Sequence, residues 1–426
     1  MAGSVTGRTV EAVWRIESAK LIGGLTRIVR DVGLAEDLAQ DALVVALERW
    51  PESGVPENPG AWLMATAKYL AIDALRRSRS LERKHEQLAR EIGIQLAMDG
   101  FDLDATLDDQ IGDDVLSLVF MCCHPVLSID ARVALTLRMV GGLATNEIAR
   151  AVLVPEPTLA QRIVRAKRTL AAARIPFEVP PGDELAARLS SVLEVVYLVF
   201  NEGYAATAGD RWIRPELCEE ALRLGRILAS LAPSEAEVHG LLALMELQAA
   251  RTAARVGPRG EPVLLRDQDR ARWDRHQIQR GLAALDRAQG EQRPGPYALQ
   301  AAIAACHARA ATPSETDWRA IAALYGALVQ LVPSPVVQLN RAVALAMAFG
   351  PAAGLELADS LVSEPSLEHY HLLPSVRGDL LQRLGRGAEA RVQFERAAAL
   401  TQNSREREVL LGRAAACAAD RVRARD

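Results

Sequence analysis

The sequence predicts an all-α protein, and three observations lead to this fold class. Half of the 426 residues are apolar, while aromatic residues make up only 4%. Alanine, leucine and arginine are abundant, and these residues cost little free energy to hold in a helix. Apolar residues recur at helical spacing between proline and glycine clusters such as Pro51–Gly60. A chain of this length is expected to form roughly two to four domains.

Charge and cysteine content limit the classes of function. The formal net charge is -4, so any nucleic-acid binding must come from local basic patches. Five cysteines in so long a chain do not indicate a disulfide scaffold and favour a reducing cytoplasm. Neither a signal-peptide core nor an apolar run of ~18 residues occurs, so we expect no membrane span. P-loop, serine-hydrolase and zinc-protease motifs are missing, so we expect no catalytic residues, no metal site and no cofactor.

Composition divides the chain into four parts. Residues 1–95 read as amphipathic helices that the Pro51–Gly60 loop interrupts. Residues 96–114 are predicted to be an extended linker, because Asp99–Asp114 contains many acidic residues and neither Lys nor Arg. Residues 115–178 form a second helical unit that stops near Pro176, and residues 179–426 form a long helical region.

An acidic stripe is predicted on the helix over residues 34–50. Leu38, Ala42 and Val45 share its apolar face, while a second face carries Asp37, Asp41, Val44 and Glu48. Such a stripe can dock on a basic partner or simply face water, and the sequence leaves both interpretations open.

The next helix is predicted to begin at Asn58-Pro59, a capping residue followed by a first-turn proline. Trp62, Tyr69 and Arg76 share an arc, and further arginines follow. An exposed surface of rings and guanidinium groups can bind unwound DNA, because bases stack on rings and phosphates meet arginine. The alternative is that Trp62 and Tyr69 belong to the core.

Residues 128–175 predict a helix-turn-helix. Gly141-Gly142 ends a first helix, Thr145 is expected to cap a second, and a third starts near Glu156. In the third helix, apolar residues spaced by three and four define a buried face, formed by Leu159, Ile163, Ala166 and Leu170. The opposite arc offers hydrogen-bond donors, as a recognition helix in a major groove requires. An ordinary surface helix with a solvated basic face is the alternative.

The region after residue 179 predicts a short helical solenoid. Residues 334–362 and 378–400 each read as two helices joined at a glycine. One such hairpin cannot bury its apolar face alone, so stacked neighbours in the manner of tetratricopeptide repeats are expected.

In their order along the chain, these motifs resemble the extracytoplasmic-function (ECF) sigma factors of bacterial RNA polymerase. The resemblance covers about the first 175 residues. It rests on A-E-D-L-A-Q-D at residues 35–41, A-W-L-x-x-x-A-x-x-x-A-I-D-x-L-R-R at 61–77, L-x-L-R-x-V-x-G-L at 135–143 and P-E-x-T-L-x-x-R-x-x-R-A-K-R at 155–168. Ala160 departs from the family pattern, in which Lys or Arg is common at this position.

The resemblance implies a non-catalytic initiation factor whose partners are core RNA polymerase, through the β′ clamp helices and the β flap, and promoter DNA. The implied polymerase contacts are Asp37, Gln40, Asp41 and Glu48. The implied contacts to the −10 element are Asn58, Trp62, Tyr69, Asp73, Arg76, Arg77 and Arg79. The implied contacts to the −35 element are Glu156, Thr158, Gln161, Arg162, Arg165 and Arg168.

Unusual strings in the rest of the chain, among them VYLVFNEGYAATAGDRWIRPELCEEALRLGRIL, resemble a subgroup of ECF sigma factors with a long tetratricopeptide-like extension. The resemblance implies that the extension regulates the factor and replaces a separate anti-sigma factor. Five residues of this segment could form a polar network or dock on the sigma domains, and the alternative is a capped helix end and loop: Asn201, Glu202, Tyr204, Arg211 and Trp212. In Cys122-Cys123-His124, three adjacent residues cannot complete a tetrahedral zinc site, so a buried structural role is expected.

Two other functions stay open from the sequence. A one-component regulator would bind duplex DNA without polymerase. A helical-repeat adaptor with a degenerate sigma-like part would bind a partner and direct no transcript.

Overall fold

The computed structural model describes residues 2–90, 111–152, 154–180, 182–205, 208–209, 212–258, 260–290 and 294–423. These residues contain eighteen α-helices and one pair of two-residue strands, so the all-α prediction is confirmed. The chain divides into two compact units, residues 1–195 and 196–426. The division lies within α8 (Gly182–Tyr204), whereas the sequence placed the start of the extension at residue 179. Across the described ranges, no helix is both long and apolar enough to cross a membrane.

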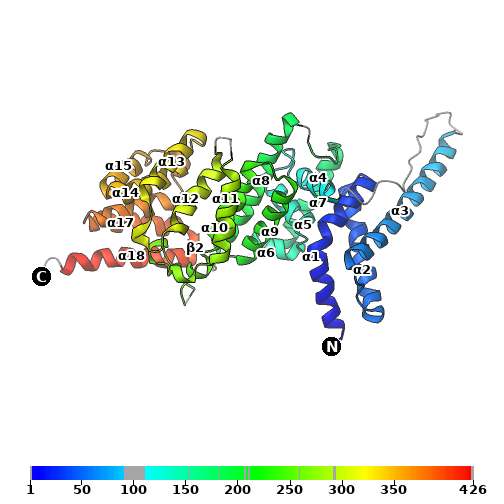
Figure 1. Ribbon diagram of the computed structural model, residues 1–426, viewed down its shortest axis with the longest axis horizontal. Coiled ribbons are helices and arrows are strands. Elements are labelled where there is room, and N and C mark those ends of the chain that lie inside the picture. Colours follow the sequence, from blue (N-terminus) through cyan, green and yellow to red (C-terminus); the bar gives the residue numbers. More distant parts are fainter. Residues whose placement is uncertain are drawn as a thin grey trace. The chain divides into compact units, whose positions relative to one another are not determined.

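The first unit begins with three helices that pack on one another (Figure 1), namely α1 (Ala2–Val29), α2 (Val32–Ser53) and α3 (Pro59–Arg90). Their core contains Ile22, Leu25 and Leu63, which are all fully buried. The predicted start of α3 is confirmed, because the Asn58 side chain accepts a hydrogen bond from the backbone N–H of Ala61 at 3.1 Å.

The fourth helix, α4 (Ile111–Cys122), begins inside the segment that the sequence assigned to the acidic linker. Residues 91–110 of that segment lie outside the described residues. Asp114 is buried and forms an ion pair with Arg27 of α1 at 3.4 Å. A partnered carboxylate can join a packed helix, which counting charges along the sequence does not reveal.

Three helices complete the helix-turn-helix of this unit, α5 (Ile129–Met139), α6 (Thr145–Ala151) and α7 (Glu156–Ala172). The cap of α6 differs from the prediction. The side chain of Glu147, rather than that of Thr145, caps the start of this helix. Its carboxylate accepts a hydrogen bond from the backbone N–H of Ala144 at 2.8 Å. The first half of α8 also belongs here, because Ser191 donates a hydrogen bond to the carbonyl of Cys123 at 2.7 Å.

A buried ion cluster links the α1–α3 bundle to the helix-turn-helix. Glu36 of α2 is only 3% exposed. Its carboxylate accepts a hydrogen bond from Nε of Arg138 in α5 at 2.6 Å and forms an ion pair with Lys167 of α7. Gln40 donates a further hydrogen bond to Glu36 at 2.7 Å. One carboxylate therefore holds side chains from both helical groups.

The second unit is a succession of helices, each packed on the next, as the predicted solenoid requires (Figure 1). They are α9 (Pro215–Leu231), α10 (Ala236–Ala249), α11 (Arg275–Ala288), α12 (Pro296–Arg309), α13 (Trp318–Leu331), α14 (Pro335–Phe349), α15 (Pro351–Ser360), α16 (Leu372–Arg383), α17 (Gly387–Leu400) and α18 (Ser404–Arg423). Short 3-10 helices lie at Thr252–Ala254, Leu265–Asp267, Arg270–Arg272, Pro313–Glu315 and Pro365–Leu367. Strand β1 (Ala208–Gly209) pairs in parallel with β2 (Gln402–Asn403).

The two hairpins seen in the sequence are α14–α15 and α16–α17. Both turn at a glycine with positive φ, Gly350 at 103° and Gly385 at 76°, a conformation that residues with a side chain rarely adopt. Phe394 of α17 is fully buried and packs with Leu380, Leu381 and Leu410 from the neighbouring helices. Each hairpin thus buries its apolar face against the next one.

Candidate nucleic-acid interface

Helix α7 has one buried face and one polar face, as its sequence pattern predicts. Leu159, Ile163, Ala166 and Leu170 are all buried. The turn that leads from α5 to α6 depends on Gly142, which has a φ of 67°. A Cβ atom at that position would lie 2.6 Å from Oγ of Ser18, so a larger residue would both strain the backbone and displace this side chain.

The predicted −35 residues lie together on the opposite face of α7. The exposed members are Glu156, Thr158, Gln161, Arg165 and Arg168. Arg162 is half-buried and forms an ion pair with Asp130 at 3.3 Å. Thr158, Gln161 and Arg165 border a surface hollow of about 400 Å³ beside the start of α5. Amide and guanidinium donors on an exposed helix face suit both base edges and phosphates.

The predicted −10 residues follow α3. Tyr69 is 72% exposed, so its ring does not belong to the core. Trp62 is half-buried and meets Trp50 edge to face, with 5.5 Å between ring centroids. Asp73 forms an ion pair with Arg77 at 2.8 Å. Two further predicted residues are exposed, Asn58 and Arg76, while the side chain of Arg79 lies outside the described part of the chain.

The acidic stripe on α2 is exposed at Asp37, Asp41 and Glu48. Gln40 is half-buried and is held by Glu36, so it does not share this exposure. Three large apolar residues of the same helix are also exposed, Leu34 at 38%, Val44 at 51% and Leu47 at 44%. Exposed apolar side chains offer area that a protein partner can bury, and the carboxylates beside them can meet a basic surface of that partner. The sequence reasoning missed Leu47, although its position outside the apolar face was visible.

The segment around Asn201–Trp212 forms a cluster inside the second unit. Arg251 donates a hydrogen bond to the hydroxyl of Tyr204 at 2.6 Å. The guanidinium of Arg255 lies over the Tyr204 ring at 3.5 Å and near the Trp212 ring at 5.6 Å. Glu202 forms an ion pair with Arg214, and Asn201 is half-buried. These contacts favour the internal polar network over a docking surface; Arg211 lies outside the described residues.

Cys122 and Cys123 are buried at the end of α4. Burial raises the pKa of both thiols, to about 11 for Cys123. The Sγ of Cys123 lies 3.3 Å from the Thr136 hydroxyl. Within the described ranges, no group of three or more His, Cys, Asp and Glu residues could hold a metal ion. The pair therefore packs as neutral thiols.

Comparisons with known proteins match this division of the chain. Residues 17–81 match sigma-70 region 2, residues 117–170 match sigma-70 region 4, and residues 188–289 match a family of unknown function, DUF6596. The chain is 28% identical over 175 residues to the probable ECF RNA polymerase sigma factor SigI of Mycobacterium tuberculosis, covering 41% of this chain and 58% of that protein. The chain belongs to the ECF sigma factors, with a C-terminal extension.

This ECF sigma factor is also 45% identical over 391 residues to the uncharacterized protein R00370 of Rhizobium meliloti, a match that covers 90% of each chain. No solved structure matches it. Sigma-70 regions 2 and 4 imply that the factor binds core RNA polymerase and promoter DNA and acts in transcription initiation. Sigma factors are non-catalytic initiation factors.

Proposed function

We propose that this ECF sigma factor docks on the β′ clamp helices through the exposed stripe of α2, with Asp37, Asp41 and Glu48 as its charges. The apolar side chains of Val44 and Leu47 lie beside these carboxylates and add area that a protein partner can bury. Contact of the helix-turn-helix unit with the β flap completes the proposed polymerase interface.

The −35 element is read, in this proposal, by the polar face of α7. The observation that carries it is the separation of faces on this helix, with four apolar residues buried and Gln161, Arg165 and Arg168 exposed. Opening of the −10 region falls to α3, where the Tyr69 ring projects into solvent near Arg76 and Arg77. An unpaired base can stack on such a ring while arginine meets the phosphates.

Transcription with purified bacterial core polymerase on a pool of genomic fragments tests the proposal. The full chain is expected to yield promoter-specific transcripts, and Arg165→Ala is expected to weaken −35 recognition by ~1–3 kcal/mol if it contacts a base. Arg319→Ala, an exposed arginine on α13, serves as the matched control and should leave output unchanged. Specific binding to duplex DNA without core enzyme, and no transcripts with it, would support the one-component regulator instead. Partner binding with neither DNA binding nor transcripts would support the adaptor.

We further propose that the extension regulates the factor and takes the place of a separate anti-sigma factor. The extent of its helical packing, from α9 to α18, supports a folded module with a role of its own. A chain that ends after α8 retains the contact between Ser191 and Cys123 within the first unit. Transcript yield from this chain should differ from that of the full chain, with circular dichroism as the control for folding. Equal yields from the two chains would remove the regulatory role.

A further inference from the structure

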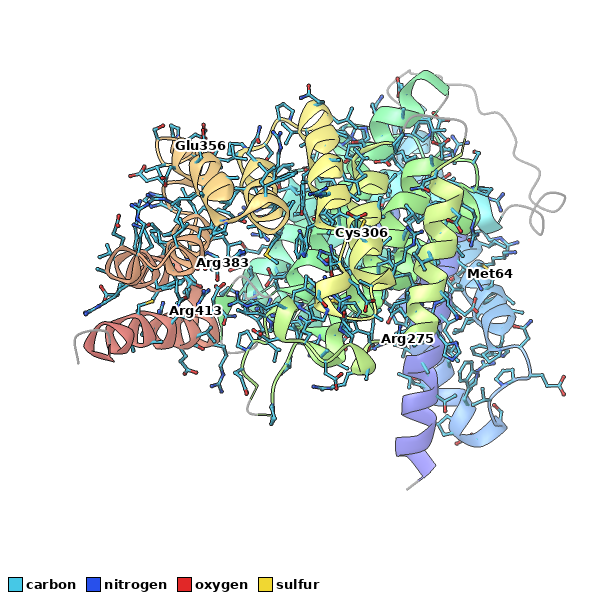
Figure 2. The ribbon with its side chains drawn as sticks, turned by 60° about the vertical axis from the view of Figure 1, so that its left-hand side comes forward. Met64, Arg275, Cys306, Glu356, Arg383 and Arg413 are labelled. Carbon is cyan, nitrogen blue, oxygen red and sulfur yellow. The ribbon has the colours of Figure 1, made fainter. Side chains whose placement is uncertain are left out.

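The second unit contains a pocket of about 280 Å³ that none of the sigma functions uses. Its wall comes from segments far apart in the sequence, namely the loop at residues 264–270, the stretch from α12 to α13, and helices α14, α16 and α18. Figure 2 labels two of its residues, Arg383 of α16 and Arg413 of α18. The volume is just below the usual range for ligand sites, ~300–1,000 Å³, so the pocket suits a small ligand.

One part of the pocket is apolar and accessible. Leu264 is 39% exposed and Met347 is 38% exposed, although both are large apolar side chains. Val376 and Trp318 also line the wall and are half-buried. A hydrocarbon or aromatic body placed here would remove this surface from water, which is favourable by ~25 cal/mol per Å².

The other part is cationic. Four arginines line the pocket, Arg266, Arg270, Arg383 and Arg413. Among the described residues of the wall, Asp379 is the one carboxylate, and it accepts from Arg413 at 2.5 Å and from Arg266 at 3.4 Å. Asp267, outside the wall, also pairs with Arg266 at 3.7 Å. Two carboxylates cannot balance four guanidinium groups, so the pocket has a positive excess.

Arg383 is the arginine with the least compensation. Its hydrogen-bond partner is Sδ of Met347 at 3.3 Å, and a thioether is a weak acceptor. No ion pair to Arg383 occurs in the part of the chain that the structure describes. A guanidinium group beside an apolar wall suits a ligand carboxylate, which it can bind with two parallel hydrogen bonds.

Two buried residues of the wall each have a polar atom without a hydrogen-bond partner among the described residues. Arg270 is 7% exposed and donates to the carbonyl oxygens of His307 and Ala310 and to the Thr316 hydroxyl. Its Nε has no hydrogen-bond partner within the described residues, and the same holds for Nδ1 of His307, which is 9% exposed. Buried polar atoms are nearly always satisfied in folded proteins, and these two belong to residues that line the pocket.

We propose that this pocket binds a small amphipathic carboxylate, with its apolar body against Leu264, Met347 and Val376 and its carboxylate at Arg383. The positive excess selects an anion, and the apolar wall selects against small hydrated ions such as phosphate. The site lies wholly within the extension and does not depend on promoter binding, so the two proposals fail or stand separately.

Isothermal titration of the full-length protein tests the site with octanoate and benzoate as anionic probes and 1-octanol as the uncharged match. We expect one equivalent of a carboxylate probe to bind and 1-octanol to bind at least ~10-fold more weakly, because a hydrogen bond to a charged group is lost. Arg383→Gln should weaken carboxylate binding by a similar factor. Arg391→Gln on α17, where the arginine pairs with Glu395 away from the pocket, should not change it.

A second variant, Val376→Trp, places a large ring in the pocket and should abolish binding while the circular dichroism spectrum stays unchanged. Three results would each overturn the proposal. These are saturable binding of neither octanoate nor benzoate, equal affinity for octanoate and 1-octanol, and unchanged carboxylate affinity in Arg383→Gln.

Discussion

Replacing Glu36 by alanine is expected to destabilise the first unit strongly. The Glu36 carboxylate is 3% exposed and is the shared partner of Arg138, Lys167 and Gln40. Truncation removes the anion and leaves two cations facing each other in a largely buried space. Removal of one partner from a buried ion pair costs ~3–5 kcal/mol, because the charge left behind is uncompensated.

The exposure of the two cations narrows the expected loss of stability in Glu36→Ala. The side chains of Arg138 and Lys167 retain 18% and 20% of their surface in water. Partial hydration relieves some of the penalty, so we expect a loss of about 3 kcal/mol, at the lower end of that range. Replacing all three members by apolar residues, as Glu36→Leu, Arg138→Met and Lys167→Met, should restore stability to within about 1 kcal/mol of the parent protein, since no charge stays buried.

Hydrogen–deuterium exchange at increasing urea concentration can measure this loss in the first unit alone. Peptides from α2, α5 and α7 should lose protection at lower urea in Glu36→Ala, while peptides from α14 to α17 should be unchanged. Asp37→Ala changes an exposed acid next to Glu36 on the same helix and should stay within about 0.5 kcal/mol of the parent. A loss below about 1 kcal/mol for Glu36→Ala would show that the cluster is hydrated in solution and would refute the reasoning.

Three further predictions concern single residues. Phe394→Ala should destabilise the second unit by ~3–5 kcal/mol in urea unfolding, because the ring is fully buried; a loss under 1 kcal/mol would contradict it. Gly142→Ala should lower the stability of the first unit by more than about 1 kcal/mol, since its φ is 67° and the new Cβ meets Ser18; an unchanged urea midpoint would count against this. Burial, with the charges of Arg251 and Arg270, lowers the pKa of His307 from 6.5 to about 4. The unfolded chain therefore binds a proton first, so the second unit should lose up to ~3 kcal/mol as pH falls from 6.5 to 4. His307→Gln should flatten that slope, and an equally steep slope in the variant would exclude His307 as its source.

Local patterns predicted the helices because the physical causes of a helix lie within a few residues. The buried face of α7 follows from the spacing of Leu159, Ile163, Ala166 and Leu170. The start of α3 follows from a capping asparagine and a proline. The hairpins of the extension follow from glycines that turn with positive φ. In each case one stretch of chain holds all the information.

The sequence predicts the packing of a helix less well when the helix is buried on several sides. In α10, residues on successive positions are buried, including Val238, His239, Gly240 and Leu241. Such a helix has no polar stripe, so periodicity cannot show which side meets which neighbour. The pocket of the extension was invisible for a related reason, because its wall combines five separate segments whose packing the sequence does not encode locally.

In α7, the order of basic residues in the sequence does not show which group each of them contacts in the folded chain. Lys167 lies in the sequence between Arg165 and Arg168, the two residues that were predicted to contact the −35 element. In the folded chain Arg165 and Arg168 are exposed, whereas Lys167 turns to Glu36, and Arg138, the other cation of that carboxylate, lies 102 residues from it in sequence. A cation that balances a buried carboxylate is not available to release counterions from a phosphate, so it adds little to the salt dependence of DNA binding. The affinity of this helix for DNA therefore depends on its exposed arginines, while the lysine between them helps to hold the helix in place within the unit.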